Sequence, residues 1–460
     1  MTTADLARPA PTGLWTLPAI VPTGRDAPDV VLGLRMLSNQ IAGWPHAVFE
    51  DDVWRPRVAG APLFVTEPQA VKTVMLDRAR DFPAGALFRR MMSPAWGRGL
   101  LLAAPESWRM QRQACAQAFR PASLALLTPR IAAVAEATLD RWLAAGRPAT
   151  VEMASEMTRA TFDIILDTML SGGEGFDRTA MQARMTQFFA DIGRMRPSYF
   201  LAPDAWHSRR PDSDSPLRAP LKAEVRAMVQ RRRAAAPRGD LVDLLFAARD
   251  PETGDGLDDA LIADNLMGFI LAGHSTTALG LTWALYILSA HTETARRIRA
   301  EVLAVAGDEP ITAEHQSGLV FTRQVVQETL RLYPPGYLLT RVSLHDTELA
   351  GVKVRAGQRV NIPVYASHRH RKRWEHPDAF DPDRFAPGRP APDRHVYMPF
   401  GAGPRICIGA AFAMLEMVTV LATLARRADF AFAGARPPLP VATLGLDPQG
   451  GMPITVSSAG

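Results

Sequence analysis

The ten residues from Phe400 to Gly409 read Phe-Gly-Ala-Gly-Pro-Arg-Ile-Cys-Ile-Gly. Three glycines and a proline predict a loop whose backbone turns sharply and can approach a flat group closely. A helical pattern over residues 410–426 follows at once, so Cys407 lies just ahead of a helix N-terminus. The unpaired N–H groups and the positive dipole end at that position favour a thiolate over a thiol. Cys407 is therefore placed to act as a charged sulfur ligand.

The residues around Cys407 argue for this ligand role over a packing role. A lone cysteine is more often a small apolar core residue, but packing alone does not explain the nearby glycines and arginine. Six positions match, in order and spacing, the pattern F-G-x-G-x-R-x-C-x-G, namely Phe400, Gly401, Gly403, Arg405, Cys407 and Gly409. The loop resembles the cysteine loop of the haem-thiolate cytochrome P-450 superfamily.

This resemblance implies a fold, a cofactor and a reaction. The fold is mainly α, a single-domain helical bundle around haem with small peripheral β-sheets. The cofactor is haem b (iron protoporphyrin IX), with the Cys407 thiolate as axial ligand to the iron. The loop residues that contact it are Phe400, Gly401, Arg405, Cys407 and Gly409. The reaction is insertion of one oxygen atom from O2 into an apolar organic substrate, by hydroxylation or epoxidation.

Composition is that of an ordinary globular protein. The 460 residues are 47% hydrophobic and 22% charged, and the net charge of +5 is too diffuse to favour nucleic acid. Two cysteines, Cys115 and Cys407, fit a reducing compartment and cannot supply four ligands to an iron–sulfur cluster. Residues 1–22 lack the pattern of a secretory signal, and no apolar run is long enough to span a bilayer. We expect a monomeric, cytoplasmic, bacterial-type enzyme without a membrane anchor.

Helical periodicity dominates the chain, which we expect to form one domain over residues 1–460 with residues 1–22 as a loosely ordered arm. The expected helices are residues 68–77, 106–119, 122–144, 152–170, 178–195, 221–236, 258–290, 292–306, 319–332 and 410–426. A short strand is expected at 62–66, strands and turns at 341–364, and a hairpin at 443–456 around Gln449-Gly450-Gly451. Residues 82–105 are expected to form an ordered loop, and 197–220 a mobile connection.

Glu328 and Arg331 are three residues apart, so they project from one face of the helix expected at 319–332. Such a pair is common on solvated helices. The superfamily, however, joins its E-x-x-R helix to an arginine in a later P-x-R-F segment, which is present here with Arg384. The resemblance therefore implies a buried ionic network of Glu328, Arg331 and Arg384 that fixes the chain leading to Cys407.

Trp108 and Arg112 lie at i and i+4 of an expected helix and present an indole N–H and a guanidinium on one face. Alone, the pair fits an amphipathic surface helix. In the superfamily a W-x-x-x-R helix reaches the haem propionates, and Arg341 and Arg405 match two further propionate-binding positions. Guanidinium groups suit carboxylates at the edge of a buried macrocycle because they donate two parallel hydrogen bonds.

The middle of the helix expected at 258–290 is interrupted by Ala272-Gly273-His274-Ser275-Thr276-Thr277. Small residues there fit a close helix–helix crossing. Equally, the hydroxyl groups could bond to backbone carbonyls that a relaxed helix leaves free, or could hold water. The resemblance makes this stretch the catalytic oxygen-binding groove, formed by Ala272, Gly273, Ser275 and Thr276, with Thr276 steadying dioxygen and passing protons to it.

Ser275 departs from the superfamily pattern, which usually has Asp or Glu before the threonine. A serine can relay a proton through water but cannot supply one as a carboxyl group does. The substrate, His274 or a carboxylate from elsewhere are alternative proton sources. The departure keeps open an electron-independent enzyme, either peroxide-driven or an isomerase, and a non-catalytic haem or gas-binding protein is a third alternative. No arginine occurs at 258–290, which disfavours a fatty-acid peroxygenase.

Apolar side chains near the expected groove predict a pocket for a small apolar substrate. They are Phe88, Met91, Met92, Phe188, Phe189, Leu338 and Leu339, although core residues have the same character. About 50 residues follow Cys407, too few for a reductase domain. We therefore expect electrons from an external ferredoxin or flavodoxin and its reductase.

Overall fold

The computed structural model describes residues 15–58, 60–144, 146–170, 172, 177–192, 218–250 and 253–459. The α-helices are α1 (Asp29–Ser38), α2 (Ala47–Glu50), α3 (Pro68–Lys72), α4 (Ala86–Trp96), α5 (Pro105–Ala116), α6 (Pro121–Ala125), α7 (Thr128–Leu143), α8 (Met153–Met169), α9 (Arg178–Ile192), α12 (Arg218–Arg233), α13 (Leu241–Ala247), α14 (Asp259–Ala290), α15 (Thr292–Ala306), α16 (Val320–Leu332), α17 (Val364–Ser367) and α18 (Ala410–Arg427). Short 3-10 or π turns are η2 (Gln40–Gly43), η3 (Thr73–Asp77), η4 (Gln117–Phe119), η5 (Glu314–Ser317) and η6 (Pro382–Phe385).

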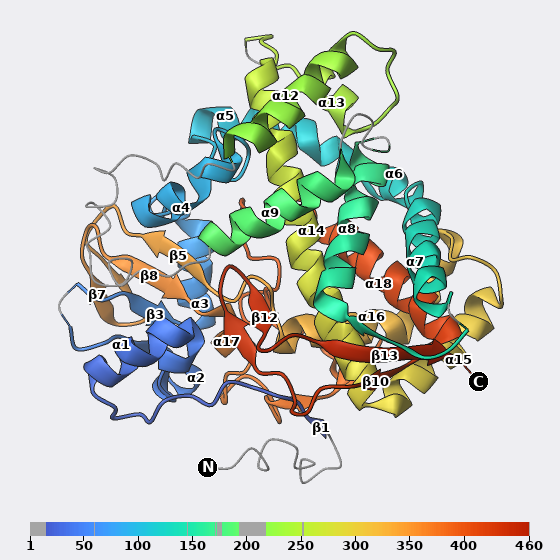
Figure 1. Cartoon of the computed structure of the whole chain (residues 1–460). Coiled ribbons are helices and arrows are strands. Elements are labelled where there is room, and N and C mark those ends of the chain that lie inside the picture. Colours follow the sequence, from blue (N-terminus) through green and yellow to red (C-terminus); the bar gives the residue numbers. More distant parts are fainter. Residues whose placement is uncertain are drawn as a thin grey trace.

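The strands are short and gather in small sheets at the periphery of the helices (Figure 1). They are β1 (Trp15–Thr16), β2 (Val53–Trp54), β3 (Leu63–Val65), β4 (Ala149–Glu152), β5 (Leu339–Val342), β6 (Thr347–Leu349), β7 (Val352–Val354), β8 (Arg359–Ile362), β9 (Ala379–Phe380), β10 (Ala428–Phe432), β11 (Pro440–Ala442), β12 (Leu446–Pro448) and β13 (Pro453–Ser458). The largest sheet has the order β2-β3-β8-β5, and a second has the order β10-β13-β4. The mainly α fold expected from the sequence is confirmed.

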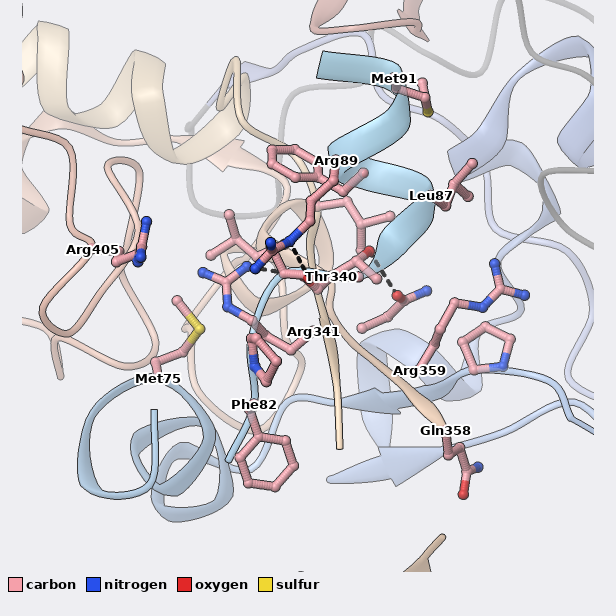
Figure 2. A pocket seen from close by; sticks show the side chains of 18 of the residues that line it. Met75, Phe82, Leu87, Arg89, Met91, Thr340, Arg341, Gln358, Arg359 and Arg405 are labelled. Atoms are coloured by element: carbon pink, nitrogen blue, oxygen red, sulfur yellow. Dashed lines mark hydrogen bonds between the residues drawn. The ribbon is translucent and has the colours of Figure 1, made fainter. Parts of the chain in front are cut away.

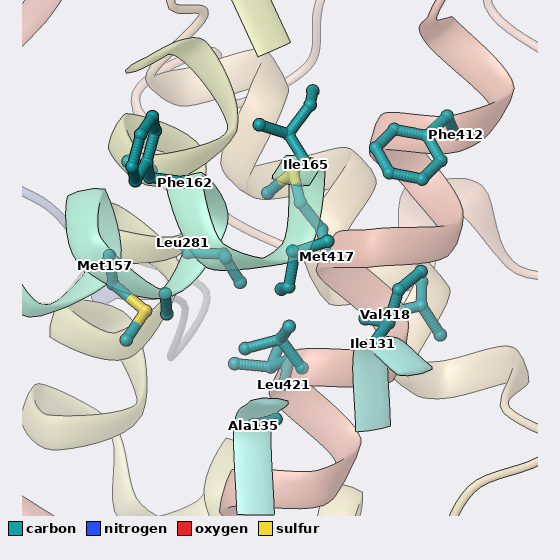
Figure 3. Close-up of a cluster of buried hydrophobic side chains, with 14 of the residues drawn as sticks. Ile131, Ala135, Met157, Phe162, Ile165, Leu281, Phe412, Met417, Val418 and Leu421 are labelled. Carbon is teal, nitrogen blue, oxygen red and sulfur yellow. The ribbon is translucent and has the colours of Figure 1, made fainter. Parts of the chain in front are cut away.

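The 32-residue helix α14 runs through the middle of the molecule, between α8 and α18 (Figure 1). It is buried on nearly all sides, which explains why its own apolar residues occur around its whole circumference instead of forming one stripe. Figure 3 shows how Leu281 of α14 meets side chains from three other helices. These are Ile131 and Ala135 of α7, Met157, Phe162 and Ile165 of α8, and Phe412, Met417, Val418 and Leu421 of α18. The centre of the chain's core is therefore all-helical.

Three local expectations are wrong, each because a distant contact decides the structure. Residues 82–105 are not a loop throughout, since α4 occupies part of them and its end packs on α14. The hairpin around Gln449-Gly450-Gly451 does not form: β12 pairs with β11, while β13 pairs with β10 and with β4, about 300 residues away. Helices α1, α2 and α13 were not expected.

The expected N-terminal arm is only partly described. Residues 1–14 lie outside the described residues, but β1 pairs with β9, and Leu17 and Ile20 are buried. Residues 15–22 are thus packed against the fold and not loosely ordered. Much of the expected connection at 197–220 also lies outside the described residues, up to residue 217.

One stretch of the described chain, Pro121–Leu143, is long and apolar enough to cross a membrane by composition alone. Most of it is α7, whose residues Ile131, Ala135 and Leu139 are buried against neighbouring helices. A core helix passes the same test of length and hydropathy, so this stretch is weak evidence for a membrane span.

The structure brings Glu328, Arg331 and Arg384 together. The Arg331 guanidinium donates two hydrogen bonds of 2.7 Å to the Glu328 carboxylate, and neither side chain is exposed. Arg331 also donates to the carbonyl groups of His368, Pro377 and Ala379. Arg384 Nε lies 3.4 Å from Glu328 Oε1. The network therefore ties the irregular chain after residue 367 to α16.

Replacing Arg331 with methionine should lower the free energy of unfolding by roughly 3 to 5 kcal/mol, because the Glu328 charge stays buried without its partner. Guanidinium chloride unfolding of the purified protein, followed by circular dichroism, measures the loss. Arg296→Met is the matched control: Glu293 and Arg296 have the same spacing but are exposed, so their separation should leave stability nearly unchanged. Equal effects of the two substitutions would contradict the structural importance of the buried pair.

Candidate active site

The loop at 400–409 folds back on itself ahead of α18. The Cys407 N–H donates to the Phe400 carbonyl at 3.0 Å, which closes the loop. Gly401 and Gly403 adopt φ values of 77° and 73°, which favour glycine. A Cβ on Gly403 would lie 1.7 Å from the Met75 carbonyl oxygen, so no larger residue fits there. The glycine pattern in the sequence is thus explained by backbone shape and by contact with η3.

The Cys407 sulfur is held in a setting with opposing effects on its charge. Its side chain retains accessible surface, although surrounding protein atoms raise the pKa of the thiol by desolvation. The Gly409 N–H and the Arg112 guanidinium lower that pKa. The sulfur is therefore accessible and lies near two groups that stabilise a thiolate, as a metal ligand requires.

Four predicted cofactor-binding residues surround the same region. Arg112 donates to the Ile406 carbonyl at 2.7 Å, so α5 is attached directly to the cysteine loop. Arg405 lies over the Trp108 ring at 5.1 Å from its centroid and donates to the Ala103 carbonyl. Arg341, on β5, is half-buried and donates only to the neighbouring Thr340 carbonyl among the described residues.

The guanidinium groups of this region have no carboxylate partner in the part of the chain that the structure describes. Figure 2 shows Arg341 and Arg405 facing one cavity, together with Arg89 of α4, which the sequence reasoning did not identify. Burial and the nearby Arg405 charge lower the pKa of Arg341 to about 10. Burial and the Arg89 charge lower the pKa of Arg405. Such a cluster is stable in the charged form when an anion binds beside it.

The middle of α14 contains both features that the sequence left open, a close helix–helix crossing and hydroxyl groups that bond to backbone carbonyls. Gly273 permits a close crossing, because a Cβ there would lie 2.2 Å from Ile165 Cδ1 of α8. Ala272 and Thr276, one turn apart on α14, are exposed within the fold. The Thr276 hydroxyl donates to the Ala272 carbonyl at 2.8 Å, and the Ser275 hydroxyl donates to the Leu271 carbonyl at 3.0 Å.

Two titratable groups lie close to this stretch. His274 is fully buried, and desolvation lowers its pKa to about 4, so the imidazole is uncharged at neutral pH. Glu416 of α18 is also buried, and desolvation raises its pKa well above the ordinary value, although the Thr277 hydroxyl lowers it. Neither carboxyl oxygen of Glu416 has a partner at ordinary hydrogen-bond geometry. The sequence signal for Glu416 was a lone acid in an apolar helical run.

A cavity of about 2120 Å³ extends from the arginine cluster toward the β2-β3-β8-β5 sheet. Of the predicted substrate-contacting residues, it is lined by Phe88, Met91, Met92, Leu338 and Leu339. Phe188 is instead buried in the helical core, where its apolar side chain packs, and the Phe189 side chain lies outside the described residues. Trp108, Arg341 and Arg405 line the same cavity, which joins the predicted substrate region to the predicted propionate region.

Comparison with known proteins gives the same family from sequence and from fold. The cytochrome P-450 family model matches residues 50–452. The chain belongs to the cytochrome P-450 family. A cyclooctat-9-en-7-ol 5-monooxygenase of Streptomyces melanosporofaciens is 31% identical over 366 residues, 78% of each chain.

Two further comparisons extend this P-450 assignment. A taurochenodeoxycholic 6 alpha-hydroxylase of Sus scrofa is 30% identical, over 86% of this chain and 82% of its own. The crystal structure of a cytochrome P-450 matches the fold with a TM-score of 0.77 at 23% identity, covering 90% of this chain and 93% of that one. The chain described in this structure is a haem-thiolate monooxygenase, and its family implies redox partners and a hydrophobic substrate.

The residues of this P-450 fit its family's cofactor. The iron of haem b accepts a thiolate ligand, and the porphyrin carries two propionate carboxylates at one edge. Cys407 provides a sulfur beside thiolate-stabilising groups, and the cluster with Arg341 and Arg405 provides cationic charge that described carboxylates do not neutralise. The donor set therefore fits both the iron and the propionate edge of the haem.

Replacing Cys407 with alanine should abolish the red-shifted Soret band of the reduced, CO-bound protein, because that band requires a thiolate ligand. Absorbance spectra of the reduced protein before and after CO addition measure the change. Cys115→Ala is the control: Cys115 is buried and desolvation raises its pKa to about 12, so it stays a thiol. A wild-type spectrum typical of histidine-ligated haem, or loss of the band in the control, would contradict ligation by Cys407.

Proposed function

We propose that this monooxygenase hydroxylates or epoxidises a small apolar substrate, with Ala272, Gly273, Ser275 and Thr276 forming the oxygen groove. Bound haem supplies the oxidising chemistry, which thiolate donation from Cys407 favours. The observation that carries the proposal is the exposure of Ala272 and Thr276 within an otherwise buried helix. The Thr276 hydroxyl can form a hydrogen bond to a polar ligand bound there and exchange protons with it. The names of the relatives, a monooxygenase and a hydroxylase, support hydroxylation.

The same proposal assigns the cofactor contacts. Arg341 and Arg405 bind the propionates, with Trp108 and Arg112 completing that edge. Phe400, Gly401 and Gly409 shape the loop around the Cys407 ligand. Support comes from the position of Arg341 and Arg405 on the cavity wall and from the hydrogen bond that joins Arg112 to the cysteine loop. Phe88, Met91, Met92, Leu338 and Leu339 contact the substrate, since all five line the cavity.

Electrons reach the enzyme from a separate ferredoxin or flavodoxin and its reductase. With two cysteines in the chain, four cysteine ligands for an iron–sulfur cluster are not available, so a donor of that class is a separate protein. The few cysteines also support a cytoplasmic location, and we further propose a bacterial origin, a monomer and a single domain. The continuous family match over residues 50–452 supports the single domain.

Protons require a source other than Ser275. Burial raises the pKa of the Glu416 carboxyl group well above its ordinary value, so the folded state favours the protonated form. Thr277 interacts with Glu416, so its hydroxyl can accept a proton from α18. Side chains at i and i+1 point in different directions on a helix, so transfer onward to Thr276 requires a bridging water. His274, by contrast, is uncharged at neutral pH and has no second proton to give. We therefore assign the missing acid to Glu416.

The alternative of an electron-independent enzyme rests on Ser275 alone and is tested directly. Compounds that shift the Soret band on binding identify usable probes. Product from these probes should form with surrogate redox partners and oxygen, and Thr276→Val should lower that product on the order of 100-fold, as loss of a proton-transferring group does. Equal or better turnover of the wild type with peroxide alone would favour the electron-independent alternative, and an absence of product under both conditions would favour a non-catalytic protein.

Glu416→Gln should remove a pH-dependent destabilisation. Above the ordinary glutamate pKa the unfolded chain releases a proton that the folded state keeps, so wild-type stability falls by about 1.4 kcal/mol per pH unit relative to the variant. The decline begins near pH 4.5 and ends at the raised folded-state pKa. Denaturant unfolding of both proteins from pH 5 to 8 measures it. The glutamine variant should also lose redox-driven product while retaining peroxide-driven product, and parallel pH curves would rule out a protonated Glu416.

A further inference from the structure

Asp264 lies near the start of α14, far along the helix from Thr276, and its carboxylate contacts both the chain after α4 and helix α12. One oxygen, Oδ2, accepts a hydrogen bond from the Arg98 N–H at 2.9 Å. The other, Oδ1, pairs with Lys222 Nζ of α12 at 2.5 Å. The Asp264 side chain is 6% exposed, so both interactions take place out of solvent.

The chain that follows α4 is seated on this part of α14. Gly97 has φ +48°, and a Cβ there would lie 2.3 Å from Asp264 Oδ2, so the carboxylate sits directly against the backbone. The next residue of α14, Asn265, accepts a hydrogen bond from the Leu100 N–H at 3.0 Å. One turn further, a Cβ on Gly268 would lie 2.9 Å from the Trp96 ring. The end of α4 is thus positioned by α14 side chains.

Helix α4 is also one wall of the substrate cavity. Phe88, Met91 and Met92 line that cavity from α4, and Figure 2 shows Met91 and Leu87 on this helix beside it. Any shift at the end of α4 therefore changes the shape of the wall.

The charge of Asp264 makes the two interactions interdependent. A buried carboxylate is stable when a cation and hydrogen-bond donors satisfy it, and Lys222 is its cation in the described chain. Without Lys222, a single backbone N–H faces the whole charge, and the carboxylate must then move toward water. Because Gly97 and Arg98 pack directly on it, that movement disturbs the end of α4.

Helix α12 carries this interaction to a further element. Glu224, two residues after Lys222 on α12, forms an ion pair with Arg184 of α9. Helices α9 and α12 are therefore attached to each other and, through Lys222, to Asp264.

We propose that Asp264 is a positioning residue that couples α12 to α4, so that its contact with Lys222 sets the place of Phe88, Met91 and Met92 in the substrate cavity. Lys222 and Asp264 together are specificity determinants that touch no substrate. The mechanical coupling stands on the contacts alone, and its effect on substrate choice rests on the proposed substrate pocket.

Hydrogen exchange of the haem-loaded enzyme tests the coupling. Lys222→Met should speed exchange of the amides of residues 86–99 by about tenfold, although Lys222 does not belong to that segment. Lys222→Arg should restore the wild-type rate. Asp264→Asn, which keeps an acceptor for Arg98 but presents a donor to Lys222, should resemble Lys222→Met. Faster exchange in α12 alone would show a local structural role and overturn the proposal.

Arg233→Met is the matched control, because Arg233 and Asp259 form a second ion pair between α12 and α14 that has no contact with residues 97–100. The control should leave exchange of residues 86–99 unchanged. An equal increase in both variants would mean that any loosening of α12 reaches α4, which contradicts a specific role for Asp264.

Spectral titration separates the effect on the pocket from the chemistry. Imidazole is small and clotrimazole is bulky, and both bind haem iron without turnover. Lys222→Met should change the Kd for clotrimazole by about tenfold and leave that for imidazole unchanged. Equal changes in both Kd values, or none in either, would overturn the specificity role. Failure of the proposed oxygen insertion would appear only in the product assay, so the two failures are distinguishable.

Discussion

The buried pair of Glu328 and Arg331 is the interaction on which the position of the cysteine loop depends. Arg331 uses its guanidinium twice, once for the Glu328 carboxylate and once for three carbonyl groups of the chain after residue 367. That chain has little regular structure of its own before α18, so few backbone ladders hold it. The ion pair replaces those ladders, and the loop around Cys407 follows directly from the segment that it fixes.

Helix α14 shows how one element serves the core and the site together. Its buried surface makes it the centre of the helical packing, and Gly273 brings it close to α8. Polar side chains interrupt this surface at particular places: Asp264 seats the end of α4, and Thr276 faces open space within the fold. Because the helix is rigid and held on all sides, the separation of these two places is fixed.

The sequence predicted most of the long helices, since their periodic patterns agree with the packing that surrounds them. It missed α4, whose apolar residues face a cavity and whose end is held by Asp264 and Asn265, contacts that no local pattern contains. It also missed the pairing of β13 with β4 for the same reason. The cysteine loop, the buried ion network and the arginine residues facing the cavity were singled out because each matches a family motif or position, and their binding of propionates stays a prediction. Phe188 was misplaced because an apolar residue suits core and pocket equally.

Three sets of charged side chains in this chain are accommodated in three different ways, and the difference indicates what each group does. Glu328 and Arg331 neutralise each other within the chain, which is sufficient for a structural role. Arg341 and Arg405 find no carboxylate among the described residues, which is what a site for an anionic cofactor edge requires. Glu416 has neither a cation nor a full set of donors, so it lowers its own charge by keeping a proton. A buried protonated acid is unfavourable as a structural element. It is useful beside the proposed oxygen groove, where Ser275 replaces the acid that the family usually has, and this is the strongest physical reason to propose that α18 supplies the protons.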